Sequence, residues 1–233
     1  MTEGAEGARP LVAVLGGTGA EGSGLALRWA AAGWSILIGS RNLERAQHAA
    51  ATLRERLGHQ IAVEGLLNAD AVSRARLAVL TVPFAAQADT LKSVKDAWQA
   101  DSILVDCSVP LAVAVGGRPT RVLGVPQGSA AQQAAELVPK GVRVVSAFHA
   151  VSAELLEHLD QSLDMDVLVC GDDRAAKAEV RPLVEAILGA RYVDGGPLES
   201  SRVVESITAL LIGINIRYKT HAGVRITGLD GRA

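Results

Sequence analysis

Aromatic residues are scarce in this chain: two Phe, two Tyr and three Trp make up 3% of its 233 residues. Cysteine is scarcer still, with only Cys107 and Cys170. Two cysteines are too few for a disulfide framework, and they lack the spacing of a zinc site. We therefore interpret both as reduced core residues of a cytoplasmic protein, and we expect no metal centre.

An excess of charge of one sign is also missing. The 23 Lys and Arg residues against 25 Asp and Glu leave a formal net charge of -2. This balance leaves no excess of positive charge that would attract nucleic acid or an anionic membrane surface. No apolar run approaches the roughly 18 to 20 residues that a membrane-spanning helix needs. The sequence thus predicts a soluble protein with neither nucleic-acid nor membrane partners.

Short β-branched runs alternate with Ala- and Leu-rich stretches from Leu11 onward. This alternation is typical of an α/β protein with a doubly wound, mostly parallel sheet of the Rossmann type. Strands are predicted at 11–15, 35–38, 61–64, 77–82, 102–106, 143–147, 165–170 and 191–194. Helices are predicted at 22–32, 43–57, 69–75, 85–98, 130–138, 173–188 and about 198–221, with Asn42 and Ser129 as N-caps and Gly33 and Gly58 at helix ends.

The composition changes near His149, which predicts two domains. We expect a flexible leader at 1–10, a Rossmann domain at 11–148 and a smaller C-terminal α/β domain at 149–233. The apolar residues of the last helix recur at helical spacing, so the helix is either a core helix or partly an intersubunit helix. Residues 110–128, rich in Pro and Gly, are either a plain crossover connection or a loop that touches a ligand.

A glycine-rich turn follows the first strand directly, as Gly16-Gly17-Thr18-Gly19-Ala20-Glu21-Gly22. It contains the spacing Gly17-x-Gly19-x-x-Gly22 between a predicted strand and a predicted helix. Gly17 would allow the tight turn, Gly19 the close approach of a pyrophosphate, and Gly22 the packing of the helix on the strand. The helix N-terminus would offer free N–H groups to phosphates. This context predicts a dinucleotide-binding domain rather than a structural turn alone.

The end of the second strand indicates which dinucleotide binds. An NAD site commonly places Asp or Glu about 20 residues beyond the turn, where it accepts from the ribose 2′-OH. Here the chain has Ser40 and Arg41, with Arg45 one helical turn later. A hydroxyl and two guanidinium groups suit a 2′-phosphate, so NADP(H) is favoured over the alternative of two solvated surface arginines.

Two further segments are expected at the same edge of the sheet. Val82, Pro83 and Phe84 follow the fourth strand, where the nicotinamide half of a dinucleotide would lie, although Phe84 could also be a core aromatic. Another strand ends near His149, which is either a core histidine or a site residue.

A Ser/His/Asp arrangement and a Tyr-x-x-x-Lys motif are both missing from the sequence. An enzyme that reduces a ketone needs a positioned proton donor. Hydride exchange between two cofactors mainly needs stacking geometry.

Several blocks together resemble the NADPH-dependent F420 reductases, the F420:NADP oxidoreductases. They keep their order from Leu11 to about Thr227 and are more specific than the glycine motif alone. The blocks are 13–19, Gly39-Ser40-Arg41, 80–84, 144–149, 169–173, 196–198 and 204–208.

The resemblance implies a cytoplasmic homodimer that moves a hydride directly between NADP(H) and the deazaflavin coenzyme F420. It implies that Thr18, Ser40, Arg41 and Arg45 hold NADP. It also implies that His149, Val151, Ser206 and Thr208 lie around the deazaflavin, with Pro83 and Phe84 beside the rings. Thr18, His149, Ser206 and Thr208 would position the rings without carrying protons.

The sequence departs from the family at Phe84 and Val151, where Trp and Ile are frequent, so ring packing is expected to differ in detail. Two alternatives remain. One is an NADPH-dependent reductase of related fold that acts on a flavin or a small imine. The other is a non-catalytic NADP-sensing domain.

Overall fold

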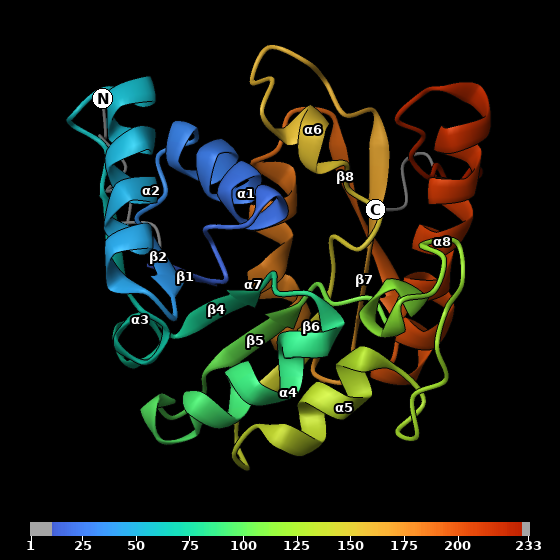
Figure 1. The fold of residues 1–233 in the computed structure, drawn as a ribbon, viewed down its shortest axis with the longest axis horizontal. Helices are drawn as coiled ribbons and strands as arrows, with labels where there is room; N and C mark the ends of the chain where they lie inside the picture. The colour runs from blue at the N-terminus through green and yellow to red at the C-terminus, as the bar shows by residue number, and fades with distance from the viewer. Residues whose placement is uncertain (1–10, 230–233) are drawn as a thin grey trace, which may run out of the picture.

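The strand that precedes the glycine-rich turn, β1 (Val12–Leu15), lies inside an eight-stranded sheet in the computed structural model, which describes residues 11–229 (Figure 1). The expected leader lies outside these residues. The strand order is β3-β2-β1-β4-β5-β6-β7-β8. The remaining strands are β2 (Ile36–Ser40), β3 (Val63–Leu67), β4 (Leu77–Leu80), β5 (Ile103–Asp106), β6 (Arg143–Ser146), β7 (Met165–Gly171) and β8 (Ala190–Gly196).

Helices join most of the strands, and a 3-10 turn and a final helix follow the last strand. In chain order they are α1 (Ala20–Ala31), α2 (Leu43–Leu57), α3 (Asn68–Arg74), α4 (Phe84–Ser93), α5 (Ala130–Leu137), α6 (Ala153–Leu156), α7 (Arg174–Glu185) and α8 (Ser201–Tyr218), with 3-10 turns η1 (Lys95–Ala97), η2 (Ala112–Val115) and η3 (Leu198–Ser200). The first six strands run parallel, and β7 pairs antiparallel with β6. The chain turns from one side of the sheet to the other between β1 and β4, the switch point at which doubly wound sheets bind ligands.

Successive residues of the central strands point to opposite faces of the sheet and pack in two separate cores. Val12 and Val14 of β1 pack in one buried cluster with side chains of α1, α2 and α7. Ala13 and Leu15 pack in the other with side chains of α3, α4 and α5. Because both faces are covered, these strands are apolar throughout, as expected for a buried parallel sheet.

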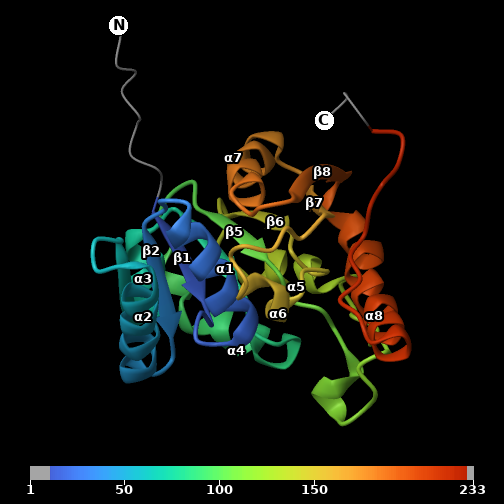
Figure 2. The same ribbon diagram turned by 90° about the horizontal axis from the view of Figure 1, so that it is seen from above.

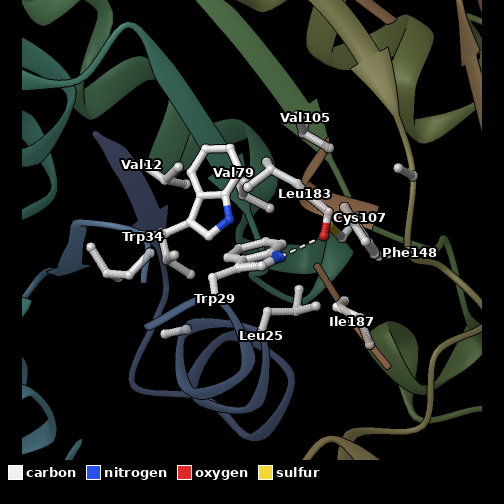
Figure 3. Packing of buried hydrophobic residues seen from close by; sticks show 14 of the residues in the cluster. Val12, Leu25, Trp29, Trp34, Val79, Val105, Cys107, Phe148, Leu183 and Ile187 are labelled. Atoms are coloured by element: carbon white, nitrogen blue, oxygen red, sulfur yellow. Dashed lines mark hydrogen bonds between the residues drawn. The ribbon is translucent and has the colours of Figure 1, made fainter. Parts of the chain in front are cut away.

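One aromatic pair ties the glycine-turn helix to the end of β6. The rings of Trp29 in α1 and Phe148 lie edge to face, with centroids 5.6 Å apart. The indole Nε1 of Trp29 also donates a hydrogen bond to the carbonyl of Leu183 in α7, at 2.8 Å (Figure 3). Phe148 holds a left-handed backbone conformation, φ 67°. Burial of these two rings therefore fixes the backbone from which His149 extends.

The predicted fold class is confirmed, and so are the caps: Asn42 accepts from the N–H of Arg45, and Ser129 from that of Gln132. Several boundaries were wrong, including the end of α7, which lies at Glu185 and not at residue 188. Strand β3 lies later than expected because Val63–Leu67, and not Ile61, pairs along β2. The helix predicted at 85–98 breaks at Val94 into α4 and η1, and the last helix opens with η3 and ends at Tyr218.

The sheet continues across the expected domain boundary. Ser146 of β6 pairs with Cys170 of β7, so residues before and after 148 share one sheet. Whether 149–233 behaves as a domain of its own stays a prediction.

Candidate active site

Two cavities lie at the carboxyl edge of the sheet, around the switch point. The smaller has a volume of about 390 Å³ and the larger about 630 Å³. Both are lined by Gly19, Thr81, Val82 and Pro83, so the two cavities adjoin, and together they are called the cleft. An elongated ligand could therefore occupy both at once.

The glycine turn forms the floor between β1 and α1. A Cβ at Gly22 would lie 2.4 Å from the Oγ1 of Thr81 and 2.8 Å from the Cα of Gly17, so only glycine allows this approach. The left-handed turn falls on Gly16, φ 75°, one residue earlier than expected. A Cβ at Gly19 would meet only the carbonyl of Gly16, at 3.4 Å, so the space in front of this residue stays open. No side chain caps α1, which leaves its first N–H groups free for an anion.

The smaller cavity carries positive charge. Ser40, Arg41 and Arg45 line it together with Thr18, and no carboxylate of the described residues lines it. The Asn42 cap accepts from the N–H of Arg45 at 2.9 Å, and this turn holds both guanidinium-bearing residues at one cavity. A dianionic phosphate fits such a donor set.

Asn68 is a lining residue that the sequence analysis missed. It is the first residue of α3, directly after β3, and only 5% of it is exposed. The residue lines the smaller cavity, and its buried Oδ1 has no hydrogen-bond partner among the described residues. A buried amide oxygen without a donor is costly, so this atom also indicates a ligand with hydrogen-bond donors.

The larger cavity is mostly apolar. Its walls come from the strand ends, from the connection after β5 and from α8: Phe84, Val109, Leu111, Val113, Ala114, Val151, Leu211 and Ile212. The 110–128 segment thus contributes to the cleft, and Phe84 belongs to the cavity rather than to the core. A largely apolar cavity of this size with a few polar groups is typical of a small-molecule site.

His149 lies between β6 and α8 and is 6% exposed. Neither ring nitrogen has a hydrogen-bond partner, and the residue lines the larger cavity. Burial lowers the pKa of His149 to about 4. The imidazole is therefore neutral at physiological pH and offers one donor and one acceptor to a ligand.

Two carboxyl groups, those of Asp106 and Glu205, lie beneath the cleft, and a third, that of Glu21, lines its larger cavity. Asp106 accepts from Ser108 and Gln87, and burial raises its pKa to about 6. Glu205 of α8 accepts from the N–H groups of Ala130 and Ala131 at the start of α5, and burial raises its pKa to about 8. Burial, and then the charge of Asp106, raise the pKa of Glu21 to about 8.

A buried guanidinium supports the wall formed by residues 150–153. Arg28 of α1, 3% exposed, donates to the carbonyls of Leu155 and Leu156 at 2.7 and 2.9 Å. It also donates to the carbonyls of His158 and Gln161. The segment that follows His149 is thereby tied to the same helix that begins at the glycine turn.

The structure brings most of the predicted site residues into the cleft. Thr18, Ser40, Arg41 and Arg45 line the smaller cavity, and Ala20, Glu21, Phe84, His149, Val151 and Thr208 the larger, while Gly19, Val82 and Pro83 line both. Gly17 and Gly22 line neither and shape the turn from below. Ser206 is exposed, lines neither cavity and donates its hydroxyl to the carbonyl of Arg202 at 2.7 Å.

These features fit a phosphorylated dinucleotide. The open space at Gly19, the free N-terminus of α1 and the two guanidinium groups match a pyrophosphate and a third phosphate. The cleft then continues into the larger cavity, with room for further rings. Cys107 and Cys170 are free and buried, as predicted.

Residues 11–229 contain neither a metal-binding cluster nor a membrane-spanning helix. No group of three or more His, Cys, Asp or Glu side chains in this range could hold a metal ion. None of the helices in this range is long and apolar enough to cross a membrane.

Several known proteins that resemble this chain are described as F420-dependent NADP oxidoreductases or reductases. Residues 11–110 match the profile of a family described as NADP oxidoreductase, coenzyme F420-dependent. The F420-dependent NADP reductase of Methanothermobacter thermautotrophicus is 44% identical over 94% of this chain and 95% of its own length. That of Methanocaldococcus jannaschii is 44% identical over 94% of this chain and 99% of its own. A solved structure from Arthrobacter sp. FB24, provisionally named an F420-dependent NADP reductase, superposes with a TM-score of 0.79, at 27% identity over 95% of this chain and 100% of that chain.

Proposed function

This chain belongs to the F420-dependent NADP reductases, and from that premise we propose how its cleft serves the reaction. The enzyme transfers a hydride between NADP(H) and coenzyme F420. The observation that carries our proposal is the joining of the two cavities through Gly19, Thr81, Val82 and Pro83. NADP(H) would lie along this shared floor, with its phosphates in the smaller cavity and its nicotinamide in the larger.

The residues of the smaller cavity would hold the dinucleotide. We assign the pyrophosphate to the N-terminus of α1 and the turn at Thr18 and Gly19. The 2′-phosphate would contact Ser40, Arg41 and Arg45, whose side chains border the cavity. Asn68 would supply its unpaired amide oxygen to a donor on the adenosine half.

The rest of the larger cavity would take the deazaflavin. Its apolar walls and the unpaired nitrogens of His149 suit a planar heterocycle with polar edges. When both are bound, NADPH supplies the hydride and coenzyme F420 accepts it, or the reverse.

The part of this chain in the reaction would be to position the nicotinamide and deazaflavin rings. Pro83, Phe84 and Val151 would limit ring movement, and a neutral His149 and Thr208 would orient the ring edges. Ser206 lies outside the cavity in a single chain, and its contact with the deazaflavin stays a prediction.

One mixing experiment tests this function. NADPH is added to the protein with oxidised coenzyme F420, and the absorbance of the deazaflavin is followed. We expect the absorbance to fall at a rate proportional to protein concentration. A protein that binds NADPH but leaves the deazaflavin oxidised, and instead reduces a flavin or a cyclic imine offered in parallel, would contradict the proposal. Binding without any turnover would favour an NADP-sensing domain.

We also propose that the enzyme is a homodimer that associates through α8. Val203 and Leu210 lie two helical turns apart on one face of this helix and are 61% and 63% exposed. The helix stands at the edge of the molecule in two perpendicular views (Figures 1 and 2). A second copy would cover this apolar strip through a twofold contact. Two free, buried thiols are consistent with a cytoplasmic setting, which we propose for the same enzyme.

A further inference from the structure

Glu21 holds an unusual place in the cleft. It lies in the first turn of α1, within the glycine-rich segment, and its side chain borders the larger cavity. It is the only carboxyl group that lines either cavity in the described part of the chain. The dinucleotide motif itself needs only the backbone at this position. The acidic side chain therefore has no role in the function described so far.

Glu21 also differs from the two carboxyl groups near it. Asp106 accepts hydrogen bonds from Ser108 and Gln87, and Glu205 accepts from two backbone N–H groups. The carboxyl of Glu21 accepts none from residues 11–229. The side chain is partly buried at the cavity wall, so its carboxyl is left to water, to a proton or to a ligand that enters the cavity.

The groups that face Glu21 are acidic or neutral. Asp106 and Cys107 come from the end of β5, and burial raises the pKa of both, with Glu21 adding to the effect on Cys107. His149, after β6, is neutral, and Glu205 of α8 lies beyond Asp106. No Lys or Arg of the described residues lines the larger cavity. A positive charge that entered this cavity would thus find Glu21 as its nearest lining carboxyl.

The reaction itself changes charge in this cavity. The nicotinamide ring of NADP⁺ carries one positive charge that NADPH lacks, while the phosphates of the two forms are the same. An ionised carboxylate in a poorly hydrated cavity attracts the oxidised ring, and a neutral carboxyl does not. Any difference between the two forms in their interaction with Glu21 therefore comes from the ring.

We propose that Glu21 couples proton binding to the redox state of the cofactor: its carboxylate favours bound NADP⁺ and its protonated form favours bound NADPH. This inference rests on the proposed function, since it needs the nicotinamide in the larger cavity. By linkage, NADP⁺ lowers the pKa of Glu21 when it binds and releases protons, so its affinity relative to NADPH rises with pH. In the free protein, burial and the charge of Asp106 raise the pKa of Glu21 to about 8. Glu21 should therefore change its protonation between pH 6.5 and 9.

Calorimetric titration with NADP⁺ and NADPH, without coenzyme F420, tests the coupling. For the wild-type protein we expect the Kd ratio of NADP⁺ to NADPH to fall by about 5-fold or more between pH 6.5 and 9. Glu21→Gln should make this ratio constant with pH. The matched control is Glu44→Gln, an exposed glutamate in the first turn of α2, which should change both affinities in the same proportion.

A second measurement, made without cofactor, shows whether Glu21 titrates and whether the variant is folded. In protein labelled with ¹³C at the glutamate carboxyls, one resonance that titrates near pH 8 should be missing from Glu21→Gln, whose remaining spectrum reports that it is folded. If wild-type protein bound neither cofactor form, the proposed function would fail. If both forms bound with a ratio that is equally flat or equally pH-dependent in wild type and Glu21→Gln, the role of Glu21 would be refuted and the proposed function would stand.

Discussion

Thr208 donates its hydroxyl hydrogen to the backbone carbonyl of His149, at 2.8 Å. The two residues are 59 positions apart, one on α8 and the other just after β6, and both line the larger cavity. This bond joins the last helix to the strand end that the Trp29 and Phe148 rings anchor. The Thr208 bond therefore helps to hold α8 against the strand end, together with the hydrogen bond between the Ser146 and Ser201 hydroxyls.

Loss of that hydroxyl should affect both stability and ring placement. We expect Thr208→Val to lower the free energy of unfolding by about 1 kcal/mol, because a part-buried carbonyl loses its donor. The KM for coenzyme F420 should rise roughly 10-fold, about 1.4 kcal/mol of binding. Denaturant unfolding and steady-state kinetics measure the two effects. Thr208→Ser keeps the hydroxyl and should stay near wild type in both; a Ser variant as impaired as the Val variant would argue against this bond.

His149 should position rings without exchanging protons. We expect His149→Ala to slow hydride transfer 10- to 100-fold, about 1.4 to 2.7 kcal/mol of barrier, with the pH profile between 6 and 9 unchanged in shape. The reason is that the pKa of His149 is about 4, so its charge does not change in that range. Single-turnover rates across pH test this. Abolished transfer, together with a pH limb present only in the wild type, would make His149 an acid or base.

The burial of His149 also predicts that the free energy of unfolding falls at low pH. The pKa of His149 is lower in the folded state, about 4, than its ordinary 6.5, so the unfolded chain binds more protons between these values. Stability should therefore be lost as pH falls from about 6.5 to 4, by up to about 1.4 kcal/mol per pH unit. Unfolding curves should show a shallower loss in His149→Ala than in the wild type; parallel curves would contradict a buried neutral imidazole.

Selection of NADPH over NADH should depend on the smaller cavity. We expect Arg41→Ala to lower kcat/KM for NADPH by roughly 10- to 100-fold, because a charge-assisted contact of about 1.5 to 3 kcal/mol is lost. The value for NADH, which lacks the 2′-phosphate, should hardly change. Lys95→Ala, an exposed cation outside both cavities, controls for net charge. Equal losses for the two cofactors would place the 2′-phosphate elsewhere.

A charge on the exposed face of α8 should separate the dimer. Leu210→Glu is expected to convert a dimer into a monomer in sedimentation velocity, since it would bury an unpaired carboxylate at the interface. Leu188→Glu, at a residue 54% exposed after α7, is the control and should stay dimeric. A Leu210→Glu variant that remains a dimer would move the interface away from α8.

The phosphate side of the cleft could be predicted from the sequence because its signals are local. The glycine spacing, the Asn42 cap and the arginines around it all lie between β1 and the first turn of α2, and their placement follows from the order of the elements. Asn68 was missed for a local reason as well. The strand before it was predicted to end at Glu64, whereas β3 continues to Leu67, so its residue at the carboxyl edge went unnoticed.

The larger cavity could be predicted only in part, because it depends on contacts between distant segments. The position of α8 against the end of β6 rests on long-range bonds such as that of Thr208, which leave no periodic signal. Helical spacing does not tell which of Ser206 and Thr208 faces inward when neither is apolar. The structure places Thr208 at the cavity and Ser206 outside it. The raised pKa of Glu21 is likewise a consequence of burial that the motif does not reveal.

Isotope transfer in a single turnover tests direct hydride exchange in one cleft most directly. NADPH carrying deuterium on the transferring face of C4 is mixed with enzyme and oxidised coenzyme F420 in ordinary water, and the reduced deazaflavin is analysed by mass spectrometry. If the two rings meet in the joined cavities, the deuterium should appear on C5 of the deazaflavin without loss to solvent. Deuterium found in the water, with an unlabelled product, would require an intervening group on the protein and would contradict direct transfer.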